Sequence, residues 1–167
     1  ASGKDRWRAG RRPLHASFKL NREGEYLALY APGNPPRLIQ EFAPRFPQQR
    51  AGCSYGQPTP DDAPSYLTPP TPGEPNTGAR AYVAIAEPPA FEPPRGFYSG
   101  PVLVELQCAN EDAVIRYTLD GTEPAREHGT PYEGPLSLSE NAVLRAVAYT
   151  DNQLASAPAT KIGRAHV

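Results

Sequence analysis

Polar side chains with oxygen atoms lie close together in the segment "IRYTLDGTEP" over residues 115–124, and three of them surround its Asp-Gly turn. Asp120, Thr122 and Glu123 are separated by at most one residue, and carboxylate and hydroxyl oxygens are the ligands that Ca²⁺ takes in proteins. Calcium needs roughly 6 to 8 oxygens, so this stretch could hold the ion only if other acidic side chains folded over it. A calcium site is therefore the first hypothesis for this stretch.

The same residues also predict a simple turn between two strands. Aspartate tolerates left-handed backbone, Gly121 supplies a positive φ, and the Thr122 hydroxyl can bond to nearby backbone. The stretch ends at Pro124, which cannot continue a strand ladder. The turn interpretation needs no residues from elsewhere in the chain, and we favour it over the metal site.

Catalytic motifs are absent from the sequence. It contains no GxSxG, HExxH, P-loop or GxGxxG pattern. Glycoside hydrolysis needs two carboxylates across a cleft, whereas the acidic residues here fall in turns or on the solvent face of predicted strands. A cysteine–histidine pair could recruit Cys108 and His128, but these belong to a predicted strand and a predicted loop. We expect no enzyme activity and no cofactor.

The two cysteines, Cys53 and Cys108, fall in different predicted modules. A disulfide between them is possible in a secreted protein, and two unrelated thiols are the favoured alternative. Neither belongs to a metal-type CxxC pair.

The elements that must position these residues are predicted to be β-strands. The 167 residues include 22 prolines, and a proline inside a helix costs about 3 kcal/mol, so long helices are not expected. Prolines cluster over 58–75 and 88–94, with short apolar runs at strand spacing on either side. This pattern predicts two compact β modules joined by an extended linker.

The charge pattern and the length of the apolar runs argue against two classes of partner, nucleic acids and membranes. Net charge is -1 with both signs interspersed, which does not favour a nucleic-acid partner, and the basic run over 4–12 is interpreted as a solvated loop. No apolar run approaches the ~18 residues of a membrane span.

In the first module, "SFKLN" (17–21) and "EYLALYAP" (25–32) flank "REG" and predict a β-hairpin. "RLIQEF" (37–42) and "CSYG" (53–56) predict two further strands. Both faces of the 25–32 strand are apolar, which is typical of a central strand in a sandwich. One face carries Tyr26, Ala28 and Tyr30, and the other Leu27 and Leu29.

In the second module, alternating residues predict strands over 82–88, 102–108, 114–119, 136–138 and 143–150. Ile115, Tyr117 and Leu119 share one strand face and are predicted core positions. Short alternating strands separated by turn residues predict a small antiparallel sandwich.

The first module resembles the second half of a bacterial lamin-tail domain. The pieces "LHASFKLNREGEYLALYAP", "EFAPRFPQQRAGCSYG" and "PTPGEPN" occur in the order and spacing of that family. The resemblance implies an immunoglobulin-like β-sandwich that binds or spaces and has no catalytic apparatus. It also implies that strands expected before "ASGKDR" are missing, so that this copy is incomplete at its N-terminus.

Residues from about Pro88 to Thr160 resemble the chitobiase/β-hexosaminidase C-terminal domain. The resemblance is carried by "GFYSGPVLVELQC", "AVIRYTLDGTEP" and "EGPLSLSENAVLRAVAYTDNQLAS". It implies an immunoglobulin-like accessory module, because the sugar-cleaving chemistry of such enzymes belongs to a separate barrel domain. Ile115, Tyr117, Leu119, Asp120, Gly121 and Pro124 are then fold-defining residues.

We therefore divide the chain into a partial lamin-tail-like domain (1–76), a linker with an entry strand (77–87) and a chitobiase C-terminal-type domain (88–160). The last residues, 161–167, end in "IGRAHV", which matches the translation of a short-read sequencing adapter. We interpret this tail as an artefact of an open-ended fragment and exclude His166 from the site.

These interpretations predict non-catalytic adhesion or spacer modules of a secreted or cell-surface bacterial multidomain protein, one that could also carry a spore-coat-H-like kinase domain. The alternative is a carbohydrate-binding accessory module of a polysaccharide-degrading enzyme. Expected partners are neighbouring domains of the chain, and a polysaccharide or cell-surface protein. Candidate contact residues are the aromatics Tyr82, Phe91, Phe97, Tyr98 and Tyr132.

Overall fold

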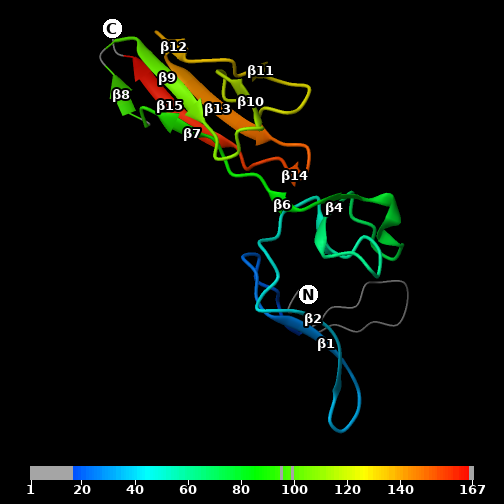
Figure 1. Cartoon of the computed structure of the whole chain (residues 1–167). Coiled ribbons are helices and arrows are strands. Elements are labelled where there is room, and N and C mark those ends of the chain that lie inside the picture. Colours follow the sequence, from blue (N-terminus) through cyan, green and yellow to red (C-terminus); the bar gives the residue numbers. More distant parts are fainter. Residues whose placement is uncertain (1–16, 95, 99, 166–167) are drawn as a thin grey trace, which may run out of the picture.

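The computed structural model describes residues 17–94, 96–98 and 100–165. Within these ranges the chain is built of short β-strands, and the single helical element is a 3₁₀ turn, η1 (Asn76–Gly78). Figure 1 shows an elongated molecule with one unit at its upper end and the other extending from its middle to its lower end, and the two are connected near β6 (Ala84–Ile85). The prediction of an all-β chain with small immunoglobulin-like sandwiches is confirmed.

The first unit contains two small antiparallel sheets. β1 (Leu27–Ala31) pairs with β2 (Arg37–Phe42) as a hairpin that projects from the unit (Figure 1). β3 (Ser54–Gly56), β4 (Ser65–Thr68) and β5 (Arg80–Tyr82) form the second sheet in the order β3-β4-β5. The buried side chains Tyr66 and Leu67 lie on the central strand of that sheet.

The pairing of the first predicted hairpin is wrong. Residues 17–21 form no multi-residue strand, and β1 pairs instead with β2 across the turn over 32–36. The reason lies in the backbone that follows residue 21. Gln49 N donates to Arg22 O at 2.7 Å and Phe46 N donates to Glu25 O at 3.0 Å. These bonds hold the "REG" turn against 46–49, and β1 forms its strand pairing with β2 instead of with residues 17–21.

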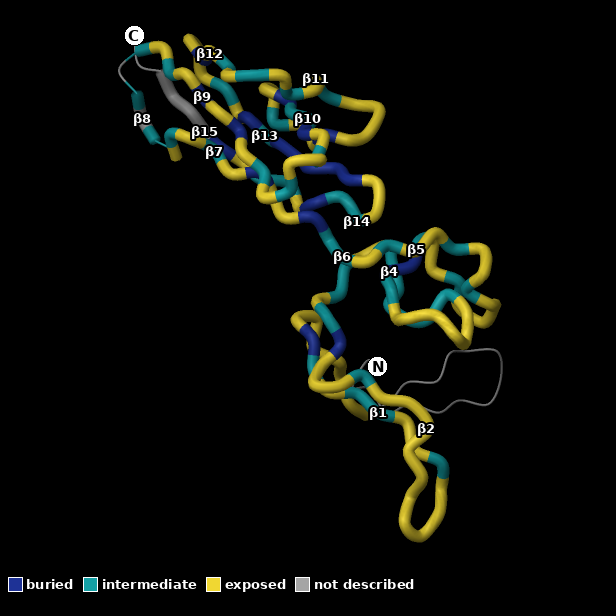
Figure 2. The backbone as a smooth tube through the Cα atoms, in the orientation of Figure 1, coloured by how far each residue is buried: buried dark blue, intermediate teal, exposed yellow. Residues whose placement is uncertain are grey.

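The prediction of β1 as a central strand is also wrong. In the described residues β1 has one hydrogen-bonded neighbour, β2. Leu29 and Tyr30 are 60% and 51% exposed, and Figure 2 shows most of the hairpin in the colour of exposed residues. A two-stranded ribbon that exposes both faces is marginally stable by itself.

The second unit is a sandwich of two sheets. One sheet has the order β12-β9-β7 and the other the order β11-β10-β13-β15-β8. The strands of the first sheet are β7 (Ala90–Glu92), β9 (Val102–Gln107) and β12 (Leu136–Leu138). Those of the second are β8 (Gly96–Tyr98), β10 (Val114–Thr118), β11 (Thr130–Pro131), β13 (Ala142–Tyr149) and β15 (Ala159–Ala165).

The core of this sandwich lies between the two sheets. Its buried members are Val104, Leu106, Leu138, Ile115, Leu144 and Ala146. Val104, Leu144 and Ala146 have no exposed surface. Fully burying a leucine or valine side chain contributes about 1.5 to 3 kcal/mol, so this cluster dominates the stability of the unit.

Leu119 is not a core residue, in contrast to the prediction. β10 ends at Thr118, and Leu119 lies one residue beyond that strand and is 43% exposed. Ile115 is buried and Tyr117 packs against the core as predicted. The buried residue at the strand end is Thr118, whose hydroxyl donates to Thr122 O at 2.6 Å and is thereby satisfied.

The last residues continue a strand. β15 pairs antiparallel with β13 from Ala142↔Gly163 to Ala146↔Ala159, and parallel with β8. Lys161 of this strand is buried and its ammonium donates to Pro93 O. The assignment of 161–167 to a sequencing adapter stays a prediction, as do the other domain limits.

Candidate functional site

The turn at the end of β10 is held by its own side chains. Asp120 Oδ1 accepts hydrogen bonds from Thr122 N at 2.9 Å and from Thr122 Oγ1 at 2.6 Å. These bonds favour the ionised carboxylate and hold the pKa of Asp120 below its usual value. Gly121 has a φ of 81°, and a Cβ there would lie 3.2 Å from Val143 Cγ1. The sequence therefore places glycine where the backbone and the packing both require it.

A cation supplied by the protein already faces this turn. Arg145 on β13 makes a 3.2 Å ion pair with Glu123 Oε2 and donates to Gly121 O at 3.3 Å. In the described part of the chain, no group of three or more His, Cys, Asp or Glu is placed to hold a metal ion. The geometry thus favours the turn interpretation over the calcium site at Asp120, Thr122 and Glu123, because a guanidinium occupies the acidic side of the loop.

The loop that follows the turn packs onto the second face of β13. Pro124 is buried and its carbonyl accepts from Tyr149 Oη at 3.2 Å. His128 closes the loop: its Nε2 lies 3.0 Å from Thr122 Oγ1, and its backbone exchanges hydrogen bonds with Ala125. The contacts of His128 therefore stabilise the loop after the turn.

The two cysteines are free and belong to different units. The thiol of Cys108, at the end of β9, points to Glu87 O at 3.9 Å, and that of Cys53 donates to Arg50 O at 3.2 Å. Cys108 follows a strand of the three-stranded sheet, whereas His128 lies in the loop beside the other sheet. The structure does not bring them together as a catalytic pair.

Two of the five predicted contact aromatics pack against the core. Phe91 and Tyr132 both lie against the buried cluster. Tyr132 Oη also accepts from Leu106 N at 3.1 Å, which connects the β11–β12 loop to β9. Their rings fill the sandwich.

The other predicted aromatics are half-buried or lie outside the described side chains. Tyr98 donates to Pro94 O, and the Lys161 ammonium stands 5.5 Å from the centre of its ring. Tyr82 belongs to β5 in the first unit, with the Arg80 guanidinium 5.0 Å from its ring centre. The side chain of Phe97 lies outside the described residues. The described members of this set do not form a row of exposed rings.

The exposed aromatic side chains of the described residues are instead Phe18, Tyr26 and Tyr30. Tyr26 and Tyr30 lie on one strand face, as the alternation predicts, and their hydroxyls are 3.4 Å apart. Tyr26 Oη also donates to Glu41 Oε2 at 3.0 Å. These bonds raise the pKa of Tyr26 above its usual value. We call Tyr26, Tyr30 and Glu41 the tyrosine cluster.

Sequence reasoning had no means of finding the acidic member of this cluster. Ala28 pairs with Glu41, but the register shifts after Leu29, so that Tyr30 pairs with Leu38. A shift of one residue moves side chains between the faces of a strand, and nothing in the local pattern marks it. The pairing of tyrosine with Glu41 follows from that register.

The connection between the two units depends on one segment, residues 151–156, which we call the joint. β6 (Ala84–Ile85) pairs parallel with β14 (Gln153–Leu154) inside it, as Figure 1 shows. Val83 N donates to Asn152 O at 3.0 Å. The predicted entry strand over 82–88 is thus divided between β5 and β6.

Arginines of the first unit also bind the joint. Arg80 Nη2 donates to Asp151 O at 2.9 Å, and Arg50 donates to the carbonyls of Ala155 and Ser156. Ser156 has no exposed surface, and its Oγ accepts from Ala148 N of β13 at 2.9 Å. The joint is therefore bonded to the core sheet of the second unit and to two cations of the first.

Comparison with known proteins adds one match. Residues 93–160 match the family model of the chitobiase/β-hexosaminidase C-terminal domain, a non-catalytic accessory module. The matched segment contains the turn at Asp120, the core cluster and the whole of the joint. No curated protein and no solved structure matches the chain. The match leaves out residues 1–92, and the resemblance of residues 1–76 to a lamin-tail domain stays a prediction.

Proposed function

We propose that the chain is a non-catalytic spacer that holds two β units, and the domains attached to them, at a fixed separation and orientation. The observation that carries this proposal is the joint. A proline-rich connection alone acts only as a semi-rigid tether. Here the connection is reinforced by the parallel pair of β6 and β14. It is also reinforced by Arg50 and Arg80, whose side chains donate hydrogen bonds to backbone carbonyls of the joint.

The joint can act in this way because its carbonyl groups have defined positions. Ser156 N donates to Ala148 O at 3.0 Å, and Thr150 Oγ1 accepts from Gln153 N at 3.1 Å. Hydrogen bonds from charged donors to such groups are stronger than neutral ones, at about 1.5 to 3 kcal/mol each. Together these bonds restrict rotation of one unit against the other.

The two native cysteines allow a direct test. Cys53 lies in the first unit and Cys108 in the second, and both thiols are free and partly exposed. Spin labels on both should give a narrow distance distribution in the unaltered chain. The double variant Arg50→Ala, Arg80→Ala should broaden this distribution, because the first unit then loses its arginine hydrogen bonds to the joint.

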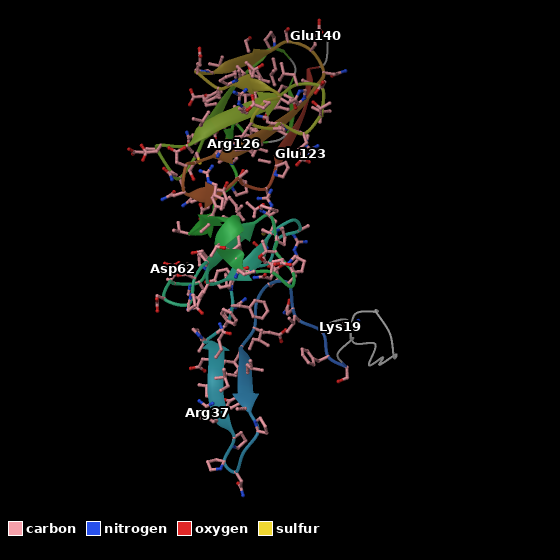
Figure 3. All side chains as sticks on the ribbon, turned by 90° about the vertical axis from the view of Figure 1, so that its right-hand side faces the viewer. Lys19, Arg37, Asp62, Glu123, Arg126 and Glu140 are labelled. Atoms are coloured by element: carbon pink, nitrogen blue, oxygen red, sulfur yellow. The ribbon has the colours of Figure 1, made fainter. Side chains whose placement is uncertain are left out.

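Arg37→Ala is the matched control, because Arg37 is an exposed arginine on the hairpin, away from the joint (Figure 3). It should leave the distribution unchanged. A broad distribution in the unaltered chain would contradict a rigid spacer, as would identical distributions in the unaltered chain and the double variant.

A second candidate function, a carbohydrate-binding accessory module, is supported by the family match over 93–160. That family takes its name from sugar-cleaving enzymes, and it is typical of secreted or extracellular proteins. We accordingly propose a secreted or cell-surface location for this chain, with neighbouring domains and a polysaccharide or cell-surface protein as partners. The described part of the chain has no helix long and apolar enough to cross a membrane. The lamin-tail identity of the first unit and an attached kinase domain belong to the same proposal.

A further inference from the structure

We propose that the tyrosine cluster on the β1–β2 hairpin is a contact site for a neutral polysaccharide. This inference deepens the second candidate function and does not depend on the spacer proposal. It places the site in the first unit, outside the segment that matches the family model. The predicted contact residues Phe91 and Tyr132 have their rings engaged in the core of the second unit.

The first requirement of such a site is exposed ring surface. Tyr26 and Tyr30 are each 51% exposed and lie on the same face of the hairpin. Leu38, which pairs with Tyr30, adds apolar surface and is 43% exposed. A pyranose ring presents C–H groups on its flat face, and tyrosine provides a rigid apolar surface with a polar tip for such a ligand. An apolar patch with polar groups beside it is typical of a binding surface.

The second requirement is a set of polar groups that complements the ligand. The single hydroxyl proton of Tyr26 goes to Glu41 Oε2, so in the 3.4 Å contact between the tyrosines Tyr30 is the donor. Both hydroxyl protons are then used within the cluster. What remains for a ligand is the lone pairs of Tyr30 and of the Glu41 carboxylate, so the site offers acceptors only.

The exposed rings and the remaining hydrogen-bond acceptors determine which class of ligand fits the site. A ligand that fits must bring many hydrogen-bond donors together with an apolar face, which describes the hydroxyl groups and the ring faces of a neutral sugar polymer. The charge of Glu41 disfavours anionic ligands such as uronic acid polymers or phosphate-bearing chains by like-charge repulsion. The acceptors are also held in place before binding, because the three side chains already bond to one another, which lowers the entropic cost of association.

Binding assays with defined polysaccharides test the inference. The 167-residue chain should be retained by insoluble chitin or by microcrystalline cellulose, and soluble chitohexaose or cellohexaose should release it. Polygalacturonate, a uronic acid polymer, should not retain it. Tyr26→Ala and Tyr30→Ala should each weaken retention at least tenfold, and Glu41→Gln several-fold.

Controls separate loss of the site from loss of the fold. Tyr30→Phe keeps the ring and should retain most of the binding, whereas Leu103→Ala removes a side chain that is 58% exposed on the second unit and should change nothing. Circular dichroism checks that each variant is folded. Absence of retention on both neutral polymers, equal retention on polygalacturonate, or unchanged retention of Tyr26→Ala and Tyr30→Ala would each overturn the proposal. The label distances across the joint are a separate measurement, so the two proposals can fail independently.

Discussion

The two units of this chain use their apolar residues in opposite ways. In the second unit, leucine and valine side chains from facing sheets meet in one cluster with almost no exposed surface. In the first unit, the hairpin presents most of its large apolar and aromatic side chains to solvent, although Phe42 packs beside the ring of Tyr55. Most of the exposed large hydrophobic side chains of the described residues lie between Phe18 and Ile39 (Figure 2).

The difference teaches that alternation alone does not decide burial. Both units contain strands with apolar residues at period two. The second unit closes two such sheets over each other, which removes the apolar faces from water. The hairpin has no facing sheet over its tyrosine face in the described residues, so a similar pattern there yields a surface suited to contact rather than to stability.

The largest expected effect distinguishes a buried leucine of the second unit from an exposed leucine of the hairpin. Leu144→Ala removes a side chain with no exposed surface from the centre of the sandwich, and should lower the free energy of unfolding of the second unit by about 2 to 5 kcal/mol. Leu29→Ala removes a side chain that is 60% exposed and should cost within about 0.5 kcal/mol. Urea unfolding followed by circular dichroism measures both. Equal losses for the two variants would mean that the hairpin leucine is buried in solution.

A smaller effect is expected at the Asp-Gly turn. Gly121→Ala should destabilise the second unit by about 1 to 3 kcal/mol, because a non-glycine residue is strained at a φ of 81° and its Cβ would crowd Val143. Gly52 in the first unit has a φ of 82°, and a Cβ there would meet no atom within 4 Å, so Gly52→Ala tests the backbone strain alone. Thermal unfolding should show the larger loss for Gly121→Ala, and equal losses would remove the packing argument.

The smallest effect concerns the pH dependence of the same turn. The pKa of Asp120 is lowered by its bonds to Thr122, so the folded state holds the ionised carboxylate more firmly than the unfolded state does. Its stabilisation is present above the unfolded pKa of about 3.9 and is lost as the pH falls through the folded value. Asp120→Asn should therefore lower the melting temperature slightly at pH 7, with a difference that shrinks towards pH 3. A difference that stays constant with pH would show that the charge plays no part.

Sequence reasoning located strands in both units, and the exposed strand over 37–42 is found with the predicted limits. In the second unit, strand length and alternation also coincide with burial. The strand over 136–138 is found with the predicted limits, and those over 102–108, 114–119 and 143–150 are found within one residue at each end. These strands pack against one shared core, so their apolar period reports directly on their environment. The prediction for Leu119 is wrong because the apolar alternation continues by one residue past the end of β10 at Thr118.

The pairing of the first unit and the members of its surface site could not be predicted in the same way. The position of the chain before β1 depends on two hydrogen bonds between Arg22 and Gln49, which are 27 residues apart, one between backbone groups and one donated by the Arg22 side chain. The contact between Tyr26 and Glu41 depends on the pairing of β1 with β2 and on the register shift within it. Local composition contains no record of either, whereas the shared face of Tyr26 and Tyr30 follows from strand geometry alone.

In the sequence as given, which includes the segment 161–167 interpreted above as an adapter artefact, the parallel pair of β8 and β15 gives the second unit a mechanical property. β8 follows the strand by which the chain enters the sandwich, β15 is the last strand of that sandwich, and they run in the same direction with Gly96↔Gly163 to Tyr98↔Ala165 in register. Tension applied before β8 and after β15 pulls these strands in opposite directions along their length. Their hydrogen bonds, and those of β15 to β13, are then loaded together in shear instead of opening one after another. Such an arrangement resists stretching along the axis of the chain more strongly than a hairpin such as β1–β2, whose bonds open in sequence when its ends are drawn apart.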